Sequence, residues 1–416
     1  MNDTLKFKTS IPLMLLFCIY LHPVMLKGPS ILSYIYIYGI PAIYLILNIS
    51  KYRILTIKQG ILIGLAIILI VLSIVYPTLH NTNDYSYVKV ATYIFRKLVV
   101  YIFLVSILAK HYKEKTTIDL FMYYFSLAQA TYVVGTILLV FLPGIKKVWF
   151  SLFNEVIDSE EYLQAYGYTF RIGWQGFSGF GFTIFCSFSC LFLMYLYYNK
   201  NSKLSLTTTQ FIVPFALCFL GNMFYGRSGL IVSIVGCLAA LVVWNRKHFF
   251  KVLKIAVLIA VVIEVVYSLR DVAFFRDWYN WMSTPIINVV KTGHFNNASF
   301  QTTQDMIFKP EMKTIFLGDG YFMQDGHYYM KTDSGFMRNI LFWGMLGLII
   351  SYGMTIYSLT ELKKKDTLLF ILFVGAFFAF EYKGHVYYDF AAIMLAFTFI
   401  DTIRQKYLVT GTVNLT

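Results

Sequence analysis

The sequence predicts an all-α polytopic integral membrane protein with about 12 transmembrane helices and one large extracytoplasmic loop. Two observations support this fold class. Of the 416 residues, 58% are hydrophobic and only 13% are charged, and the mean hydropathy is +0.65. Apolar runs recur along the chain, and a long polar stretch at 269–335 separates the last of them from the others. Soluble globular domains have far fewer apolar and more charged residues than this chain.

The individual spans follow from the lengths of the apolar runs. A bilayer core of about 30 Å is crossed by about 20 apolar residues in a helix. The expected spans are 10–26, 31–49, 57–77, 92–109, 118–142, 177–198, 208–225, 228–244, 249–268, 336–360, 367–380 and 385–403. We therefore expect a membrane domain at 1–268, the loop at 269–335 and a second membrane part with a cytoplasmic tail at 336–416.

The distribution of Lys and Arg predicts the orientation. Basic residues lie in alternate connections between the spans, for example Lys51 with Arg53, and Lys363 to Lys365. The positive-inside rule places these connections and both termini in the cytoplasm, so the loop at 269–335 lies outside. The net charge of +14 does not indicate nucleic-acid binding, because the basic residues are spread over short loops and form no soluble basic face.

The sequence predicts neither a metal site nor a cofactor. The five cysteines all lie inside apolar runs, where we expect them to pack as small buried side chains. The chain has no nucleophile elbow, zinc-protease motif, phosphate-binding loop or dinucleotide fingerprint in a suitable context. Within the outer loop, the aromatic segment 271–282 predicts a short helix lying along the membrane surface, with an ordinary aromatic belt as the alternative.

Cations at the outer ends of the spans indicate an anion-binding site. A charge at mid-bilayer costs about 2.5–3.5 kcal/mol on insertion scales, so each one needs a reason. The arginines in question are Arg171, Arg227, Arg270, Arg276 and Arg338. Arginine can hold phosphate oxygens through two parallel hydrogen bonds, and Arg227 also opens a helix between Gly226 and Gly229. The alternative is that these side chains snorkel or pair with acids or lipid headgroups.

The outer loop also carries possible general bases. Asp319, His327 and Asp333 are titratable side chains that could accept a proton from a reacting hydroxyl. His327 lies two residues after Asp325, but such pairs are usually solvated loop residues and do not make a metal site. The residue types alone do not choose among the three.

Several short motifs give the chain a family resemblance. They are Arg171–Gly173, Gly226–Leu230, Leu317–Gly320, Thr332–Arg338 and Phe342–Gly347. With these motifs and its overall architecture, the chain resembles the bacterial O-antigen polymerases of the Wzy type and, more distantly, the O-antigen ligases. The ligases carry a histidine at the foot of the helix that follows the large loop. This chain has Asp333 there, which favours a polymerase.

The resemblance implies glycan transfer without a nucleotide sugar, as in membrane-embedded type C glycosyltransferases. The donor and the acceptor would be undecaprenyl-diphosphate-linked glycans at the outer face of the bacterial cytoplasmic (inner) membrane. Arg227, Arg171 and either Arg270 or Arg276 would hold the diphosphate, with Arg338 as a further candidate. Implied partners are membrane lipids and a chain-length regulator protein, with no nucleic acid.

Two other functions remain open. A ligase would share the site and differ in its acceptor. A flippase for the lipid-linked unit, which is a transporter, would fit the number of spans equally well. The long outer loop argues against a flippase, because transporters of this size usually keep short connections and place their polar residues near the midplane.

Overall fold

The computed structural model describes residues 5, 7–48, 55–154, 171–244, 268, 276, 278–280, 283 and 304–413. Nearly all regular structure in this part of the chain is helical. Eight of its helices are long and apolar enough to cross a membrane. This fits a multi-pass, all-α membrane protein, as the composition predicts.

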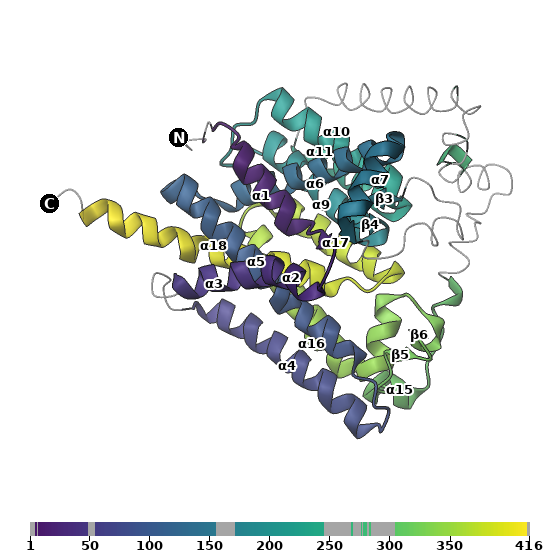
Figure 1. Cartoon of the computed structure of the whole chain (residues 1–416). Coiled ribbons are helices and arrows are strands. Elements are labelled where there is room, and N and C mark those ends of the chain that lie inside the picture. Colours follow the sequence, from purple (N-terminus) through teal and green to yellow (C-terminus); the bar gives the residue numbers. More distant parts are fainter. Residues whose placement is uncertain are drawn as a thin grey trace. The chain divides into compact units, whose positions relative to one another are not determined.

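The chain divides into two compact units, which are described separately. Unit 1 comprises Met1–Ile37 and Asp119–Asn297, and unit 2 comprises Tyr38–Ile118 and Ala298–Thr416. The helices of unit 1 are α1 (Ile11–Leu21), α2 (Ser30–Tyr34), α6 (Ile118–Phe141), α7 (Pro143–Leu152), α9 (Phe180–Tyr198), α10 (Thr208–Tyr225) and α11 (Arg227–Trp244), and they are labelled in Figure 1. Its short antiparallel strand pairs are β1 (Met25–Leu26) with β2 (Phe153–Asn154), and β3 (Ile172–Gly173) with β4 (Gly176–Phe177).

Helix α9 is the central packing element of unit 1. It lies against α10 and α11, and 13 of its 19 residues are buried. Glycines allow this close approach: a Cβ added at Gly221 would lie 2.6 Å from Cys186 Sγ, and one added at Gly236 would lie 2.5 Å from a methyl of Leu191. All five cysteines of the chain are buried and free, in agreement with a packing role.

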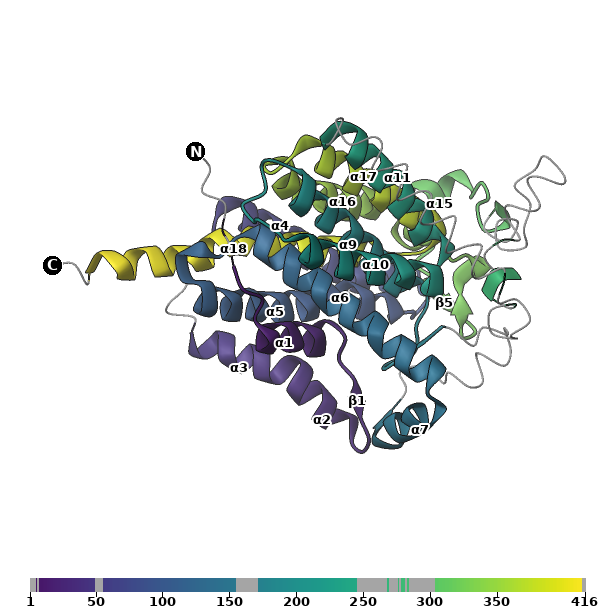
Figure 2. The ribbon, with the colours of Figure 1, turned by 90° about the horizontal axis from the view of Figure 1, so that it is seen from above.

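Unit 2 is built around α16 and α18. Its helices are α3 (Ile40–Leu47), α4 (Ile57–Leu79), α5 (Ser86–Tyr112), α15 (Met312–Leu317), α16 (Gly335–Lys363), α17 (Thr367–Lys383) and α18 (Tyr387–Val413), and its one hairpin pairs β5 (Met323–Gln324) with β6 (His327–Tyr328). Short elements are the π-helix η1 (Ile35–Gly39) at the boundary of the units and the 3-10 turns η3 (Lys113–Lys115) and η5 (Tyr329–Lys331). Helix α18 packs on α5 and α16, and α16 also contacts α4, α15 and α17. The two views in Figures 1 and 2 show these helices running side by side.

Helix α16 is interrupted at Gly344, and the segment that follows α15 fills the break. Gly344 has φ +64° and ψ −156°, so the helix does not continue through it. The backbone N–H groups of Asp319 and Gly320 donate to the carbonyls of Leu341 and Phe342, at 2.6 Å and 3.0 Å. The loop therefore satisfies carbonyl groups that the interrupted helix leaves without partners.

Most described helices coincide with predicted spans, with a few differences. Helix α5 begins at Ser86 instead of 92, so Arg96 and Lys97 lie about three turns inside the helix and do not open it. Helix α1 has only 11 residues, fewer than a bilayer crossing needs. The predicted span at 249–268 falls outside the described residues except for residue 268. The number of twelve spans therefore stays a prediction.

The aromatic segment predicted at 271–282 is described only at four positions. Arg276 and residues 278–280 are helical. Trp278 is buried in unit 1, where its Nε1 donates to the carbonyl of Met223 at 3.0 Å and its ring packs against Phe224. The prediction that the aromatic residues of this segment face the membrane interface is thus wrong for Trp278, because a hydrogen-bond acceptor within the protein is available to its indole.

Candidate functional site

The structure divides the predicted site residues between the two units. Unit 1 contains the predicted anion ligands Arg171, Arg227 and Arg276, and unit 2 contains Asp319, His327, Asp333 and Arg338. Arg270 lies outside the described residues. Unit 2 thus holds all three candidate bases together with one candidate anion ligand.

In unit 1, Arg227 is the first residue of α11 and is held at a tight helix-to-helix turn. The hydroxyl of Thr183 donates to the carbonyl of Gly226 at 2.8 Å. A Cβ added at Gly229 would lie 2.0 Å from the same hydroxyl oxygen, so only glycine fits there. Because α9 and α11 approach this closely, the backbone around the half-buried Arg227 is fixed in position.

A buried polar network supports this turn. Asn222 Oδ1 lies within hydrogen-bond distance of the hydroxyls of Thr183, at 2.8 Å, and Ser187, at 3.2 Å, while its Nδ2 donates to Ser233 at 2.9 Å. The single hydrogen of Thr183 is shared between Asn222 and the carbonyl of Gly226. All four side chains are fully buried. A fully satisfied network in an apolar interior fixes one arrangement of the helices that contribute to it. Here those helices are α9, α10 and α11.

The other arginines of unit 1 have different settings. Arg171 is half-buried and precedes β3, and its carbonyl accepts a hydrogen bond from the backbone N–H of Ser178 at 2.9 Å. Arg276 is exposed. Of the three, Arg227 is the one that begins a long helix, and the first turn of that helix packs closely on α9 at Gly229.

In unit 2, Arg338 is a buried cation without an ionic partner among the described residues. It lies in the first turn of α16 and is only 9% exposed. Its guanidinium carbon is 3.5 Å from the ring centroid of Tyr328 and 4.1 Å from that of Phe322. Its Nε is buried and has no hydrogen-bond partner in the described chain. The aromatic faces stabilise the cation but cannot accept the hydrogen bond that this N–H would donate to an anion.

Asp333 lies two residues before α16 and is the candidate base that interacts with Arg338. Partial desolvation raises the pKa of its carboxyl group, while the positive charges of Arg338 and Lys383 act in the opposite direction. Thr332 beside it donates from its hydroxyl to the carbonyl of Met306 at 2.8 Å, which holds the segment in place. Asp333 itself is exposed and accessible to a substrate.

The other two candidate bases are placed less favourably. Asp319 Oδ1 accepts a hydrogen bond from the hydroxyl of Thr314 at 2.7 Å, and its backbone N–H joins α16. Burial, together with the charge of Asp319, raises the pKa of the neighbouring Tyr329. His327 is exposed in β6. Asp319 therefore has a structural role in the loop, and Asp333 is the strongest candidate for a base.

Sequence reasoning missed a polar network in the same unit. Asn339, the neighbour of Arg338, accepts a hydrogen bond from Tyr87 at 2.7 Å and lies 3.1 Å from His385 Nε2. Its amide nitrogen is 3.4 Å from the hydroxyl of Tyr352, which donates to Glu381 at 2.6 Å. These residues come from three helices and one connection, so no local motif reveals them. What the sequence does show of this network is that several polar residues lie in predicted spans or at their ends.

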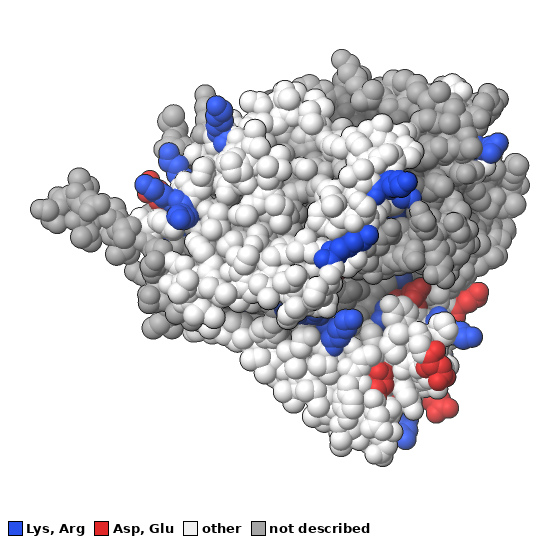
Figure 3. All heavy atoms as spheres, in the orientation of Figure 1, with Lys and Arg blue, Asp and Glu red and all other residues white. Residues whose placement is uncertain are grey.

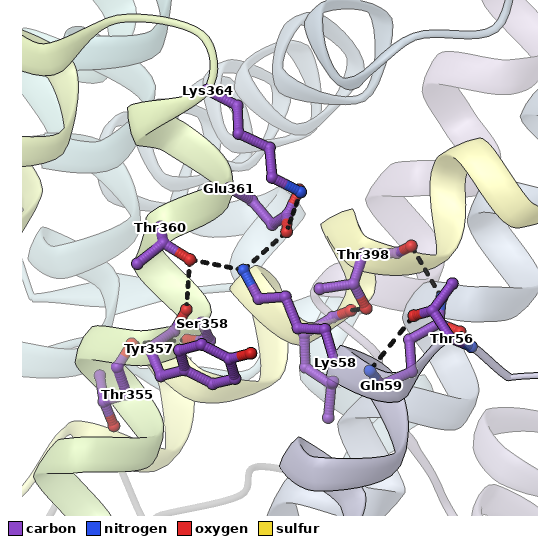
Figure 4. Close-up of polar contacts among 11 residues, drawn as sticks. Thr56, Lys58, Gln59, Thr355, Tyr357, Ser358, Thr360, Glu361, Lys364 and Thr398 are labelled. Atoms are coloured by element: carbon purple, nitrogen blue, oxygen red, sulfur yellow. Dashed lines mark hydrogen bonds and ion pairs between the residues drawn. The ribbon is translucent and has the colours of Figure 1, made fainter.

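The opposite end of α16 is charged as well, but there the charges are paired. Glu361 accepts hydrogen bonds from Lys58 of α4 at 2.6 Å and from Lys364 at 2.8 Å, and Lys58 also donates to Thr360. Figure 4 shows both lysines converging on Glu361, with Gln59 bonded to α18 nearby. This cluster links α4, α16 and α18 and leaves its buried carboxylate fully compensated.

Several exposed acidic residues of unit 2 lie near the N-terminal end of α16. Exposed acidic residues here are Asp305, Glu311, Asp325 and Asp333. Figure 3 shows acidic side chains gathered over α15 and the β5–β6 hairpin. In the described part of the chain, no three His, Cys, Asp or Glu side chains form a group that could hold a metal ion.

Comparison of the chain with protein-family models, with curated proteins and with solved structures finds no match. The assignment of a function therefore depends on the chemistry of the residues.

Proposed function

We propose that this protein polymerises undecaprenyl-diphosphate-linked oligosaccharide repeat units into an O-antigen or capsule-type polysaccharide, at the outer face of the cytoplasmic membrane. The observation that carries the proposal is the buried Arg338, whose Nε lacks a partner among the described residues. Asp333 and Glu381 act on Arg338 through their charge, but no described carboxylate forms an ion pair with it, and a buried N–H without an acceptor is unfavourable. We take the retention of this arginine to indicate an anionic ligand. The diphosphate of a lipid-linked glycan is an anion located at the membrane surface.

In this proposal Arg338 binds the diphosphate of the donor. The guanidinium group contacts the rings of Tyr328 and Phe322, and its N–H groups would donate to phosphate oxygens. Negative charge grows on the diphosphate as it leaves, so a fixed cation there lowers the barrier. Arg227 and Arg171 of unit 1, with Arg270 or Arg276, are proposed as further anion ligands.

The reaction needs one proton transfer. The hydroxyl oxygen of the acceptor sugar attacks the anomeric carbon of the donor glycan and forms the new glycosidic bond. The bond between that carbon and the diphosphate oxygen breaks, and the diphosphate leaves with the electron pair. The carboxylate of Asp333 accepts the hydroxyl proton, and its raised pKa makes it a better base than an ordinary aspartate.

A gel profile of surface polysaccharide and its lipid-linked precursors, from the host with and without the gene, tests the proposal. A polymerase predicts that the polymer ladder collapses to a single repeat unit on its normal acceptor. Long lipid-linked polymer that accumulates unattached would instead identify a ligase. Single units accumulating at the cytoplasmic face would identify a flippase. Either of the last two results contradicts the proposal.

Restoring the gene with Arg227→Ala tests the unit 1 ligands by the same gel. We expect an inserted, folded protein that gives little polymer, because the turn around Arg227 is held by Thr183 and Gly229 and not by the arginine side chain. A normal ladder from this variant would remove Arg227 from the proposed diphosphate ligands.

A further inference from the structure

A carboxylate far away in the sequence holds the loop that covers Arg338. Asp84 lies between α4 and α5. Its Oδ2 accepts hydrogen bonds from the backbone N–H groups of Phe322, at 2.5 Å, and Met323, at 2.6 Å. Its Oδ1 accepts from the backbone N–H of Ser86 at 3.1 Å and from the hydroxyl of the same residue. One oxygen therefore forms a local turn, and the other reaches across to the outer loop.

The two backbone groups held by Asp84 begin the segment that carries both aromatic neighbours of Arg338. The Phe322 ring contacts the guanidinium group directly. Met323 pairs with Tyr328 in the β5–β6 hairpin, and Tyr328 is the second aromatic contact. The backbone N–H of Tyr329 returns to the carbonyl of Phe322 at 3.1 Å, which closes the hairpin. A shift of this hairpin would therefore move both rings.

A second contact from the same connection holds the loop just before the hairpin. The hydroxyl of Thr82 donates to the carbonyl of Gly320 at 2.8 Å. The Tyr87 ring, in the first turn of α5, packs edge-on against Phe322 with the centroids 4.6 Å apart. The connection between α4 and α5 thus supports the loop through a carboxylate, a hydroxyl and a ring.

We propose that Asp84 is a positioning residue for the anion site at Arg338, an inference that depends on the proposed function. Its carboxylate fixes the hairpin so that the Phe322 and Tyr328 rings, which are inclined at 62° to each other, both lie against the guanidinium group. The guanidinium group is then held in one orientation for the diphosphate. Asp84 does not take part in the chemistry, because both of its oxygens are occupied by hydrogen bonds within the protein.

The test is a double-mutant cycle on the binding of inorganic pyrophosphate to the purified full-length protein, measured by calorimetry. Asp84→Asn keeps the size of the side chain. Its amide NH2 group is a donor, so either the N–H groups of Phe322 and Met323 or that of Ser86 would lose their acceptor. We expect the dissociation constant to rise about tenfold, since charge-assisted hydrogen bonds that fix the hairpin are lost. Arg338→Met should weaken binding more, and the double variant should bind no worse than Arg338→Met alone.

Asp325→Asn is the matched control, because it removes one carboxylate charge from the exposed end of the same hairpin. We expect it to bind pyrophosphate like the wild type. Wild-type affinity in Asp84→Asn, or effects of Asp84→Asn and Arg338→Met that add, would overturn the positioning role. Unchanged affinity in Arg338→Met would instead contradict the proposed anion site itself.

Thr82→Val provides a second variant in case Asp84→Asn does not fold. It removes the hydrogen bond to Gly320 together with the longer contacts of the same hydroxyl with Pro77 and the backbone N–H of Asp84, and it leaves the Asp84 carboxylate in place. We expect a smaller increase in the dissociation constant that again vanishes in the Arg338→Met background. Wild-type affinity in Thr82→Val would then overturn the inference.

Discussion

The two ends of α16 differ in how their buried charges are paired. At one end Glu361 receives hydrogen bonds from two lysines, and Lys58 is bonded further to Thr360 (Figure 4). At the other end Arg338 has aromatic rings on its guanidinium group and a buried Nε without a partner in the described chain. A compensated charge serves the fold, whereas an uncompensated one lowers stability and is typical of a functional site.

Arg338→Met should produce the largest effect. If the charge is kept for a ligand, removing it should lower polymer synthesis by about 100-fold or more, in the range found for loss of one group that stabilises a developing anion. The melting temperature should change little, because the loss of cation–π contacts is offset by removal of a buried charge. Polymer yield and thermal unfolding of the same preparations check this. Lys309→Met, which removes an exposed cation of the outer loop, is the control and should behave as wild type.

Glu361→Gln should show the reverse behaviour. It removes the carboxylate that compensates Lys58, whose side chain is 16% exposed. Breaking a buried pair on one side costs about 3–5 kcal/mol, so we expect a much lower melting temperature with normal activity per folded molecule. Asp401→Asn is the control, since its pair with Arg404 is on the surface and should contribute at most about 1 kcal/mol. Equal destabilisation by the two variants would contradict the contrast between the ends of the helix.

Gly344→Ala tests the break that separates the two ends. The residue has φ +64°, and an added Cβ would lie 2.5 Å from the carbonyl oxygen of Phe316. We expect a loss of about 1–3 kcal/mol, the usual cost of a strained backbone, with the loop displaced from α16. Gly353→Ala in the same helix should instead be neutral or slightly stabilising, because an added Cβ there meets no atom within 4 Å. Thermal unfolding distinguishes the two, and equal stability would show that the break is not required.

The pH dependence at the foot of α16 should be the smallest effect. Partial desolvation raises the pKa of Asp333, so the proposed base becomes protonated at a higher pH than an ordinary aspartate. Activity should therefore begin to fall, on acidification, above the usual range for aspartate. The effect on stability has the opposite sign. The folded state binds the proton of Asp333 more strongly than the unfolded state does, so the contribution of this group to the free energy of unfolding is present at low pH and lost as pH rises.

Asp333→Asn provides the corresponding comparison. The variant should have low activity, and what remains should no longer show this acidic limb in a profile of rate against pH. If the limb persists unchanged in Asp333→Asn, the titrating group is a different residue.

Local patterns predicted much of the fold, and some of the site, from the sequence. The run of apolar segments predicted a helical membrane protein, and the glycines around Arg227 marked the start of α11. Asp333 and Arg338 marked the N-terminal end of α16 as a candidate site. These features depend on composition and on neighbours in sequence, which periodicity and motif reading can detect.

The surroundings of Arg338 could not be predicted in the same way. Phe322 and Tyr328 lie against the guanidinium group in a segment that is hydrogen-bonded to Asp84, a residue before α5 that is more than 200 positions away. The sequence predicts an uninterrupted span at 336–360, because the apolar run continues through Gly344. The N–H groups that bond the carbonyls of Leu341 and Phe342 come from Asp319 and Gly320, which precede the helix. Contacts between distant segments leave no periodic signal in the sequence.

The most direct test of the central claim is the shift in melting temperature that inorganic pyrophosphate causes in the wild type and in Arg338→Met. A ligand that binds only the folded state at 100 times its dissociation constant stabilises it by about 2.7 kcal/mol. We predict that pyrophosphate clearly raises the melting temperature of the wild type and does not change that of Arg338→Met. It should also raise the melting temperature of Glu361→Gln, which is lower than that of the wild type before the ligand is added. An equal shift in Arg338→Met would show that the charge at the foot of α16 is not there to bind this anion.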